Sequence, residues 1–67
     1  MISYAPLFRT MKEKNITAYQ LNKMGFSNTT YHSIKRGNGI TMKTLNTLCD
    51  LLDCDITDVV EYVKEQK

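Results

Sequence analysis

The most chemically suggestive stretch of the sequence runs from Gly25 to Gly39 and reads GFSNTTYHSIKRGNG. It holds hydroxyls, amides, an imidazole and two cations, and it has no acidic residue. On a helix over residues 27–36, Tyr31 and Ile34 would point toward a core. The opposite face would carry four side chains that can donate to and accept from the edges of bases: Asn28, Thr29, His32 and Ser33. This stretch therefore predicts a surface that contacts nucleic acid.

His32 is the only histidine in the chain. A catalytic or metal-binding role would require acidic, thiol or imidazole partners about one helical turn away. The residues at those positions are Asn28, Thr29, Lys35 and Arg36, none of which is such a partner. We therefore favour a contact to a base or phosphate over an uninvolved, solvent-exposed imidazole, and we expect no catalytic residue.

The other candidate ligands are two cysteines and a group of acids late in the chain. Cys49 and Cys54 match neither a CxxC redox motif nor a zinc site, so we expect two reduced thiols in a cytoplasmic protein. Asp55 and Asp58 are better explained as a cap and a first-turn charge than as metal ligands. The sequence has no phosphate-binding glycine loop and no nucleophile–base pair, and we expect no enzyme, metal, cofactor or small-molecule ligand.

The formal net charge is only +2, but the charges are unevenly distributed. Residues 1–44 carry seven cations and one acid, whereas residues 45–67 carry two cations and six acids. A basic part of a small domain suggests a polyanionic partner on that side. Charge alone leaves this reading and an accidental clustering of surface charges equally open.

Helices must position the candidate residues, and one local pattern marks where they begin. An apolar residue precedes a Ser, Thr or Asp, and a second apolar residue follows four positions after it. The pattern occurs as Ile16-Thr17-xxx-Leu21, Phe26-Ser27-xxx-Tyr31, Ile40-Thr41-xxx-Leu45 and Cys54-Asp55-xxx-Val59. Each is a helix N-cap flanked by a hydrophobic staple, and Gln20 completes a capping box with Thr17.

These starts, with an earlier helix around residues 4–11 capped by Ser3, predict an all-α fold of five short helices. The other four helices are expected over residues 17–24, 27–36, 42–52 and 56–63, and no segment is expected to form a strand. The predicted core centres on Phe8, Leu21, Tyr31, Ile34, Leu45, Leu48 and Leu52. Three methionines, Met11, Met24 and Met42, are expected to fill gaps in this core. Tyr62 and Val63 are expected to join Val59 on the inner stripe of the last helix.

At 67 residues the chain has room for one domain, over residues 1–67, with one small core. No apolar run approaches the roughly 20 residues of a membrane span, and Pro6 interrupts the apolar N-terminal stretch, so neither a membrane segment nor a signal peptide is expected. A cytoplasmic protein is the expectation.

Two short helices joined by a turn that contains Gly25, the second with a polar outer face, form a helix-turn-helix. The segments TAYQLNKMGFSNTTYHSIKRG and ITMKTLNTLCDLLDCDITDVVEYV resemble the Cro and phage-repressor type, or XRE, family in its short single-domain version. The resemblance covers about residues 4–63. It implies a lambda-repressor-like fold in a bacterial or phage-encoded protein, with the helix over residues 27–36 in the major groove of double-stranded DNA.

Carried over by position, the resemblance assigns base contacts to Asn28, Thr29, His32 and Ser33. It assigns phosphate contacts to Thr17, Ser27, Thr30, Lys35, Arg36, Asn38 and Lys43. The implied function is a sequence-specific transcription regulator, most simply a repressor. The alternative is a protein-interaction module, antitoxin-like or inhibitor-like, that retains the fold. The two differ in salt dependence, because binding through several phosphates weakens steeply as salt rises.

Family members read DNA as pairs of subunits on adjacent half-sites, so a homodimer is expected. The apolar residues left over late in the chain place its interface at Leu51, Ile56 and Val60. A monomer in which the last helix only closes the core is the alternative.

Overall fold

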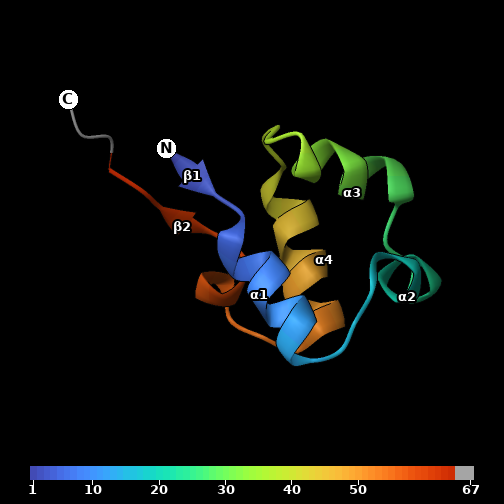
Figure 1. The fold of residues 1–67 in the computed structure, drawn as a ribbon. Coiled ribbons are helices and arrows are strands. Elements are labelled where there is room, and N and C mark those ends of the chain that lie inside the picture. Colours follow the sequence, from blue (N-terminus) through green and yellow to red (C-terminus); the bar gives the residue numbers. More distant parts are fainter. Residues whose placement is uncertain (65–67) are drawn as a thin grey trace.

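The computed structural model describes residues 1–64. Four α-helices follow one another along the chain: α1 (Ala5–Glu13), α2 (Ala18–Lys23), α3 (Asn28–Lys35) and α4 (Met42–Leu52). A short 3-10 helix, η1 (Ile56–Asp58), and a two-stranded ribbon of β1 (Ile2–Ser3) and β2 (Glu61–Tyr62) complete the fold. In Figure 1, α1 and α4 form the body, α3 lies across one end of it, and α2 lies beside α3. The predicted all-α class is confirmed.

Three of the predicted N-caps are made by side-chain hydrogen bonds. Thr17 Oγ1 accepts from the Gln20 amide at 3.1 Å while Gln20 Oε1 accepts from the Thr17 amide at 3.0 Å, which is the predicted capping box. Ser27 Oγ accepts from the Thr30 amide at 3.3 Å, and Thr41 Oγ1 accepts from the Thr44 amide at 3.1 Å. These caps fix where α2, α3 and α4 begin, because each satisfies an amide that the helix itself leaves unpaired.

A glycine follows the C-cap residue of both α2 and α3. Gly25 has φ 110° and Gly37 has φ 85°, values that side chains with a Cβ rarely adopt. In the turn that contains Gly25, Asn22 Nδ2 also donates to the Phe26 carbonyl at 3.0 Å. This bond holds the turn between α2 and α3 closed and so fixes the direction in which α3 leaves.

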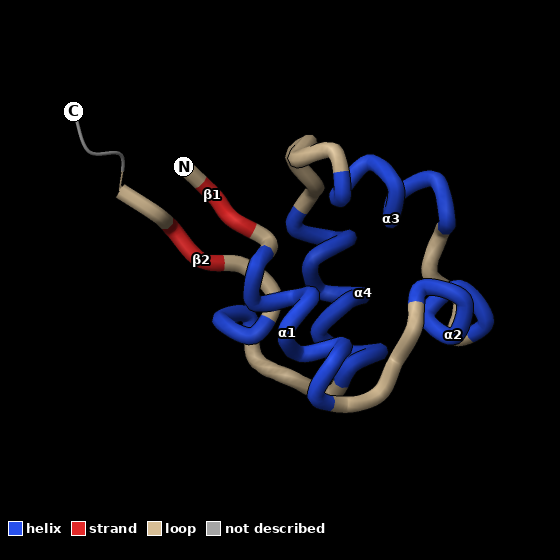
Figure 2. Tube along the Cα trace, in the orientation of Figure 1, coloured by secondary structure: helices blue, strands red, loops and turns tan. Residues whose placement is uncertain are grey.

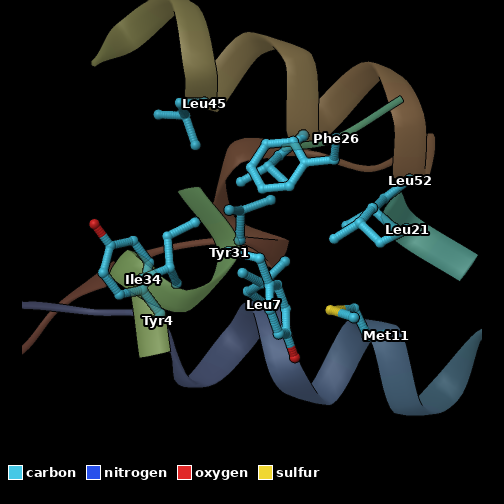
Figure 3. Packing of buried hydrophobic residues seen from close by; sticks show 11 residues of the cluster. Tyr4, Leu7, Met11, Leu21, Phe26, Tyr31, Ile34, Leu45 and Leu52 are labelled. Atoms are coloured by element: carbon cyan, nitrogen blue, oxygen red, sulfur yellow. The ribbon is translucent and has the colours of Figure 1, made fainter. Parts of the chain in front are cut away.

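The core forms where α1 faces α4. Leu7 and Met11 of α1 point toward Leu45 and Leu52 of α4, with Phe26 between them (Figure 3). The buried cluster consists of Tyr4, Leu7, Met11, Leu21, Phe26, Tyr31, Ile34, Leu45, Leu48, Leu52 and Val59. It contains six of the seven residues predicted to be central.

Three residues predicted for the core are not among its buried residues. Phe8 is only half-buried, and its ring meets the Tyr31 ring edge-on with the centroids 6.3 Å apart. Met24 is 40% exposed and Met42 is 77% exposed, so of the three methionines only Met11 fills the core. Met42 is the first residue of α4, at the end of the helix.

The predicted helix over residues 56–63 is wrong, and so is the expectation that no strand forms. Only η1 is helical, and the chain then extends into β2, which pairs antiparallel with β1 so that Ile2 faces Tyr62 and Ser3 faces Glu61 (Figure 2). The segment is rich in β-branched residues, and β1 offers it a partner from the other end of the chain. Val59 is fully buried as predicted, but Tyr62 and Val63 are exposed rather than on an inner stripe.

Hydrogen bonds from α1 hold η1 against the body. The Thr10 hydroxyl donates to the Asp58 carbonyl at 2.7 Å, and the Leu7 amide donates to the Val59 carbonyl at 3.2 Å. At the start of α1, Ser3 accepts from the Ala5 amide at 3.1 Å, but the N-cap position predicted for Ser3 is held by Tyr4, which makes no side-chain cap bond. No helix within residues 1–64 has the length and apolar character needed to cross a lipid bilayer. The last three residues of the expected domain range, 65–67, lie outside the described residues.

Candidate nucleic-acid interface

The outer face of α3 carries the four predicted base-contacting residues on one accessible surface. Tyr31 and Ile34 are buried and anchor α3 to the core, while Asn28, Thr29 and His32 are exposed. Ser33 is half-buried at the edge of this face. The face is free of acids, and α3 has no acid in its first turn. It therefore presents donors and acceptors of the size needed to meet base edges without repelling phosphate.

The predicted phosphate-contacting residues lie around this face at helix ends. Thr17 and Ser27 cap α2 and α3, Thr30 is half-buried, and Arg36 ends α3 in the open. Lys43 is exposed in the first turn of α4, which has no acid there either. The Lys35 ammonium lies 5.9 Å from the centroid of the Tyr31 ring, so its stem is directed along α3. These positions put cations and hydroxyls at or near the ends of α2, α3 and α4.

Asn38, in the turn after α3, is held at three atoms. Its amide donates to the Ser33 carbonyl at 3.1 Å, its carbonyl accepts from the Tyr4 hydroxyl at 2.6 Å, and its Nδ2 donates to Ser33 Oγ at 3.1 Å. The sequence predicted a phosphate contact for Asn38 but gave no sign of Tyr4, whose hydroxyl comes from 34 residues away. The structure thus joins the N-terminal segment to the edge of the α3 face.

A second feature that the sequence did not predict lies on α2. Tyr19 is 70% exposed, and the Lys23 ammonium lies 5.1 Å from the centroid of its ring. The two residues are one helical turn apart, which is the only sequence signal for this pairing. It places one more cation and an exposed aromatic ring on the helix that precedes α3.

The three residues predicted for a dimer interface do not line one groove. Ile56 lines an open groove of about 260 Å³ with Met42, Leu45, Asn46 and Cys49. Val60 lines a neighbouring groove of about 170 Å³ with Ile2, Tyr4, Gly39, Ile40, Met42 and Leu45. Leu51 lines neither groove and packs against the core from the other flank of α4. Both grooves are lined by uncharged residues, and Met42 stands between them.

A more polar hollow of about 330 Å³ lies between the end of α1 and the segment that follows α4. It is lined by Thr10, Glu13, Lys14, Asp53, Cys54, Asp55 and Asp58. Within residues 1–64 no group of three or more His, Cys, Asp or Glu side chains is arranged to hold a metal ion. Burial raises the pKa of Cys49 and Cys54 above the usual value for a thiol, and neighbouring carboxylates raise both further. Such thiols are protonated at neutral pH, which does not suit a nucleophile.

Comparisons with known proteins bear on this interface. The family model for the Cro/C1-type helix-turn-helix DNA-binding domain matches residues 7–65. The crystal structure of the transcriptional regulator VanUg superposes on this fold with a TM-score of 0.83 and 23% sequence identity, over 96% of this chain and 87% of that one. No curated protein matches the sequence. The chain therefore belongs to the family of Cro/C1-type helix-turn-helix DNA-binding domains, which is not a family of enzymes.

Proposed function

We propose that this protein is a sequence-specific regulator of transcription that inserts α3 into the major groove of double-stranded DNA and acts as a repressor. The observation that carries the proposal is the acid-free outer face of α3, where Asn28, Thr29 and His32 are exposed. Asn can bond adenine bidentately, while Thr and His can reach several base edges. The similar fold of VanUg, a transcriptional regulator, supports the same reading. Repression follows most simply, since a domain seated on a promoter blocks polymerase.

Around this face, the proposed phosphate contacts are side chains at the helix ends. They are Thr17, Ser27, Thr30, Lys35, Arg36, Asn38 and Lys43. Lys43 and Arg36 supply charge, while the caps supply hydroxyl protons that the helix amides do not use. Several such contacts release counterions from DNA, so affinity should fall steeply with salt.

The proposed active form is a homodimer, because one helix the size of α3 reads only a few base pairs. The two uncharged grooves beside Met42 supply the apolar surface for a second copy, with Ile56 and Val60 at the contact. Their lack of charged lining residues lets two identical surfaces meet without like-charge repulsion. Leu51 has no part in this version of the interface.

The experiment is selection of bound duplexes from a random library, followed by affinity measurements at several salt concentrations. Asn28→Ala should cost about 1–3 kcal/mol on the best site and relax specificity at one position. Lys43→Ala should weaken all duplexes alike, whereas Lys14→Ala, which removes the same charge beside the polar hollow, should change little. Binding without sequence preference, or affinity that ignores salt, would favour the protein-interaction alternative instead.

The dimer is tested separately, by sedimentation with and without the selected site. Ile56→Asp should reduce the stoichiometry on DNA from two subunits to one, because it places a charge in the groove. The adjacent Thr57→Asp adds the same charge outside both grooves and serves as the control. Saturation of the best site by one wild-type subunit would show that the protein binds as a monomer.

A further inference from the structure

The Ser33 hydroxyl at the edge of the α3 face already has a bond to the protein. Asn38 Nδ2 donates to Ser33 Oγ at 3.1 Å, which uses one of the two lone pairs of the hydroxyl. Among residues 1–64 no bond is found in which the Ser33 hydroxyl donates. The comparable hydroxyl of Thr47, on α4, instead donates to the Lys43 carbonyl of its own helix at 3.1 Å. Ser33 therefore keeps its proton available for a group outside the protein.

The backbone of Asn38 is held on both sides of the side chain that reaches Ser33. Its amide bonds the Ser33 carbonyl at 3.1 Å, in the turn that Gly37 closes with φ 85°. Its carbonyl accepts from the Tyr4 hydroxyl at 2.6 Å. Tyr4 is itself only 9% exposed and belongs to the core cluster, so the donor is rigid. The core thus fixes the backbone position from which the exposed Asn38 side chain reaches Ser33.

We infer that Asn38, oriented by Tyr4, is a specificity-determining residue that makes Ser33 read its base as a hydrogen-bond donor. This inference rests on the proposed function, since it concerns what α3 meets in the major groove. A donating hydroxyl suits the acceptor groups N7 and O6 of guanine, O4 of thymine and N7 of adenine. It suits cytosine least, because cytosine presents only its N4 amino group, a donor. Asn38 acts through Ser33 and needs no base contact of its own.

The substitution Asn38→Asp tests directly whether Ser33 acts as a donor to the base, because it replaces the amide donor of Asn38 with an acceptor of the same shape. An ionised carboxylate can only accept, so the Ser33 hydroxyl would turn its proton toward the new carboxylate rather than toward the base. Ser33 Oγ would then offer lone pairs alone, which suit the amino groups of cytosine N4 and adenine N6. One base position should therefore shift its preference toward cytosine.

The experiment compares base preferences in duplexes selected by the wild type, Asn38→Asp, Ser33→Ala and the double variant. Ser33→Ala identifies the position, at which preference should flatten. Asn38→Asp should shift the preference there by about 3- to 10-fold in favour of cytosine, the size of one hydrogen bond. The double variant should show no such shift. Ratios between bases are compared at one salt concentration, because the added negative charge weakens binding to every duplex equally.

Tyr4→Phe provides a second measurement, with the fold checked by thermal melting. It removes only the hydroxyl, and it should weaken discrimination at the Ser33 position without moving preference to cytosine. The inference is overturned if Ser33→Ala leaves every position unchanged, or if Asn38→Asp does not raise the preference for cytosine at the Ser33 position. Either result can occur while wild-type protein still selects a defined site, whereas absence of any selected site would instead overturn the proposed function.

Discussion

The hydrogen bond between Thr10 and the Asp58 carbonyl should carry a measurable part of the stability of this small domain. Thr10 is 6% exposed, and its hydroxyl reaches Asp58, 48 residues away, at 2.7 Å. Thr10→Val keeps the shape of the side chain and leaves the Asp58 carbonyl without this donor. The expected cost is about 1–3 kcal/mol, since a partly buried carbonyl then lacks a partner. Thr and Val have similar helix propensities, so the helix itself should be unaffected.

The total stability sets the scale of this loss. A domain of 67 residues is stable by roughly 3–10 kcal/mol, and each kcal/mol moves the melting temperature by about 4–8 °C. Thr10→Val should therefore melt about 4–24 °C below wild type, as followed by circular dichroism. Thr47→Val is the matched control, because its hydroxyl bonds only the Lys43 carbonyl within the exposed surface of α4. Equal melting temperatures for Thr10→Val and wild type would show that this bond does not hold η1 in place.

Three further expectations concern stability. Leu48→Ala should lower the free energy of unfolding by roughly 2–5 kcal/mol, because Leu48 is fully buried. Much of the protein should then be unfolded in a thermal melt, and a melting temperature near that of wild type would contradict the packing of α4. Ser27→Ala should cost about 1 kcal/mol in urea unfolding by removing the cap of α3, whereas an unchanged urea midpoint would mean that the cap contributes nothing. Burial raises the pKa of Cys49 and Cys54 in the folded protein, so the unfolded chain loses these two protons at a lower pH. The free energy of unfolding should therefore be undiminished below about pH 8.5 and fall at higher pH. Replacing both thiols by Ser should flatten that fall, as measured by urea midpoints from about pH 7 to 10.

Features encoded by neighbouring residues are predictable from the sequence. The caps Thr17, Ser27 and Thr41 lie within four residues of the groups that they satisfy, and the staples beside them follow the same short spacing. These signals locate the turn between α2 and α3 and indicate the family, which the family model confirms. Local rules suffice because capping and staple contacts depend on few residues.

Features that depend on distant partners are not predictable in this way. Nothing near Glu61 indicates that β1 will pair with it, so the capped apolar pattern around Val59 favours a helix. The bond from Tyr4 to Asn38 likewise joins residues that share no local pattern, and it places Asn38 against Ser33. Apolar character alone groups Leu51 with Ile56, although Leu51 packs against the core and does not line the groove that Ile56 lines. In each case tertiary contacts decide the outcome.

The pairing of β1 with β2 turns the chain into a closed loop of about 60 residues. Closing a loop of that length has an entropic cost that two pairs of residues, Ile2 with Tyr62 and Ser3 with Glu61, do not offset alone. We therefore expect the helices to assemble first and to bring the two strands together. Sequence changes in the ribbon should accordingly alter the rate at which the protein unfolds far more than the rate at which it folds. On this expectation, β1 and β2 pair only after the helices have packed together.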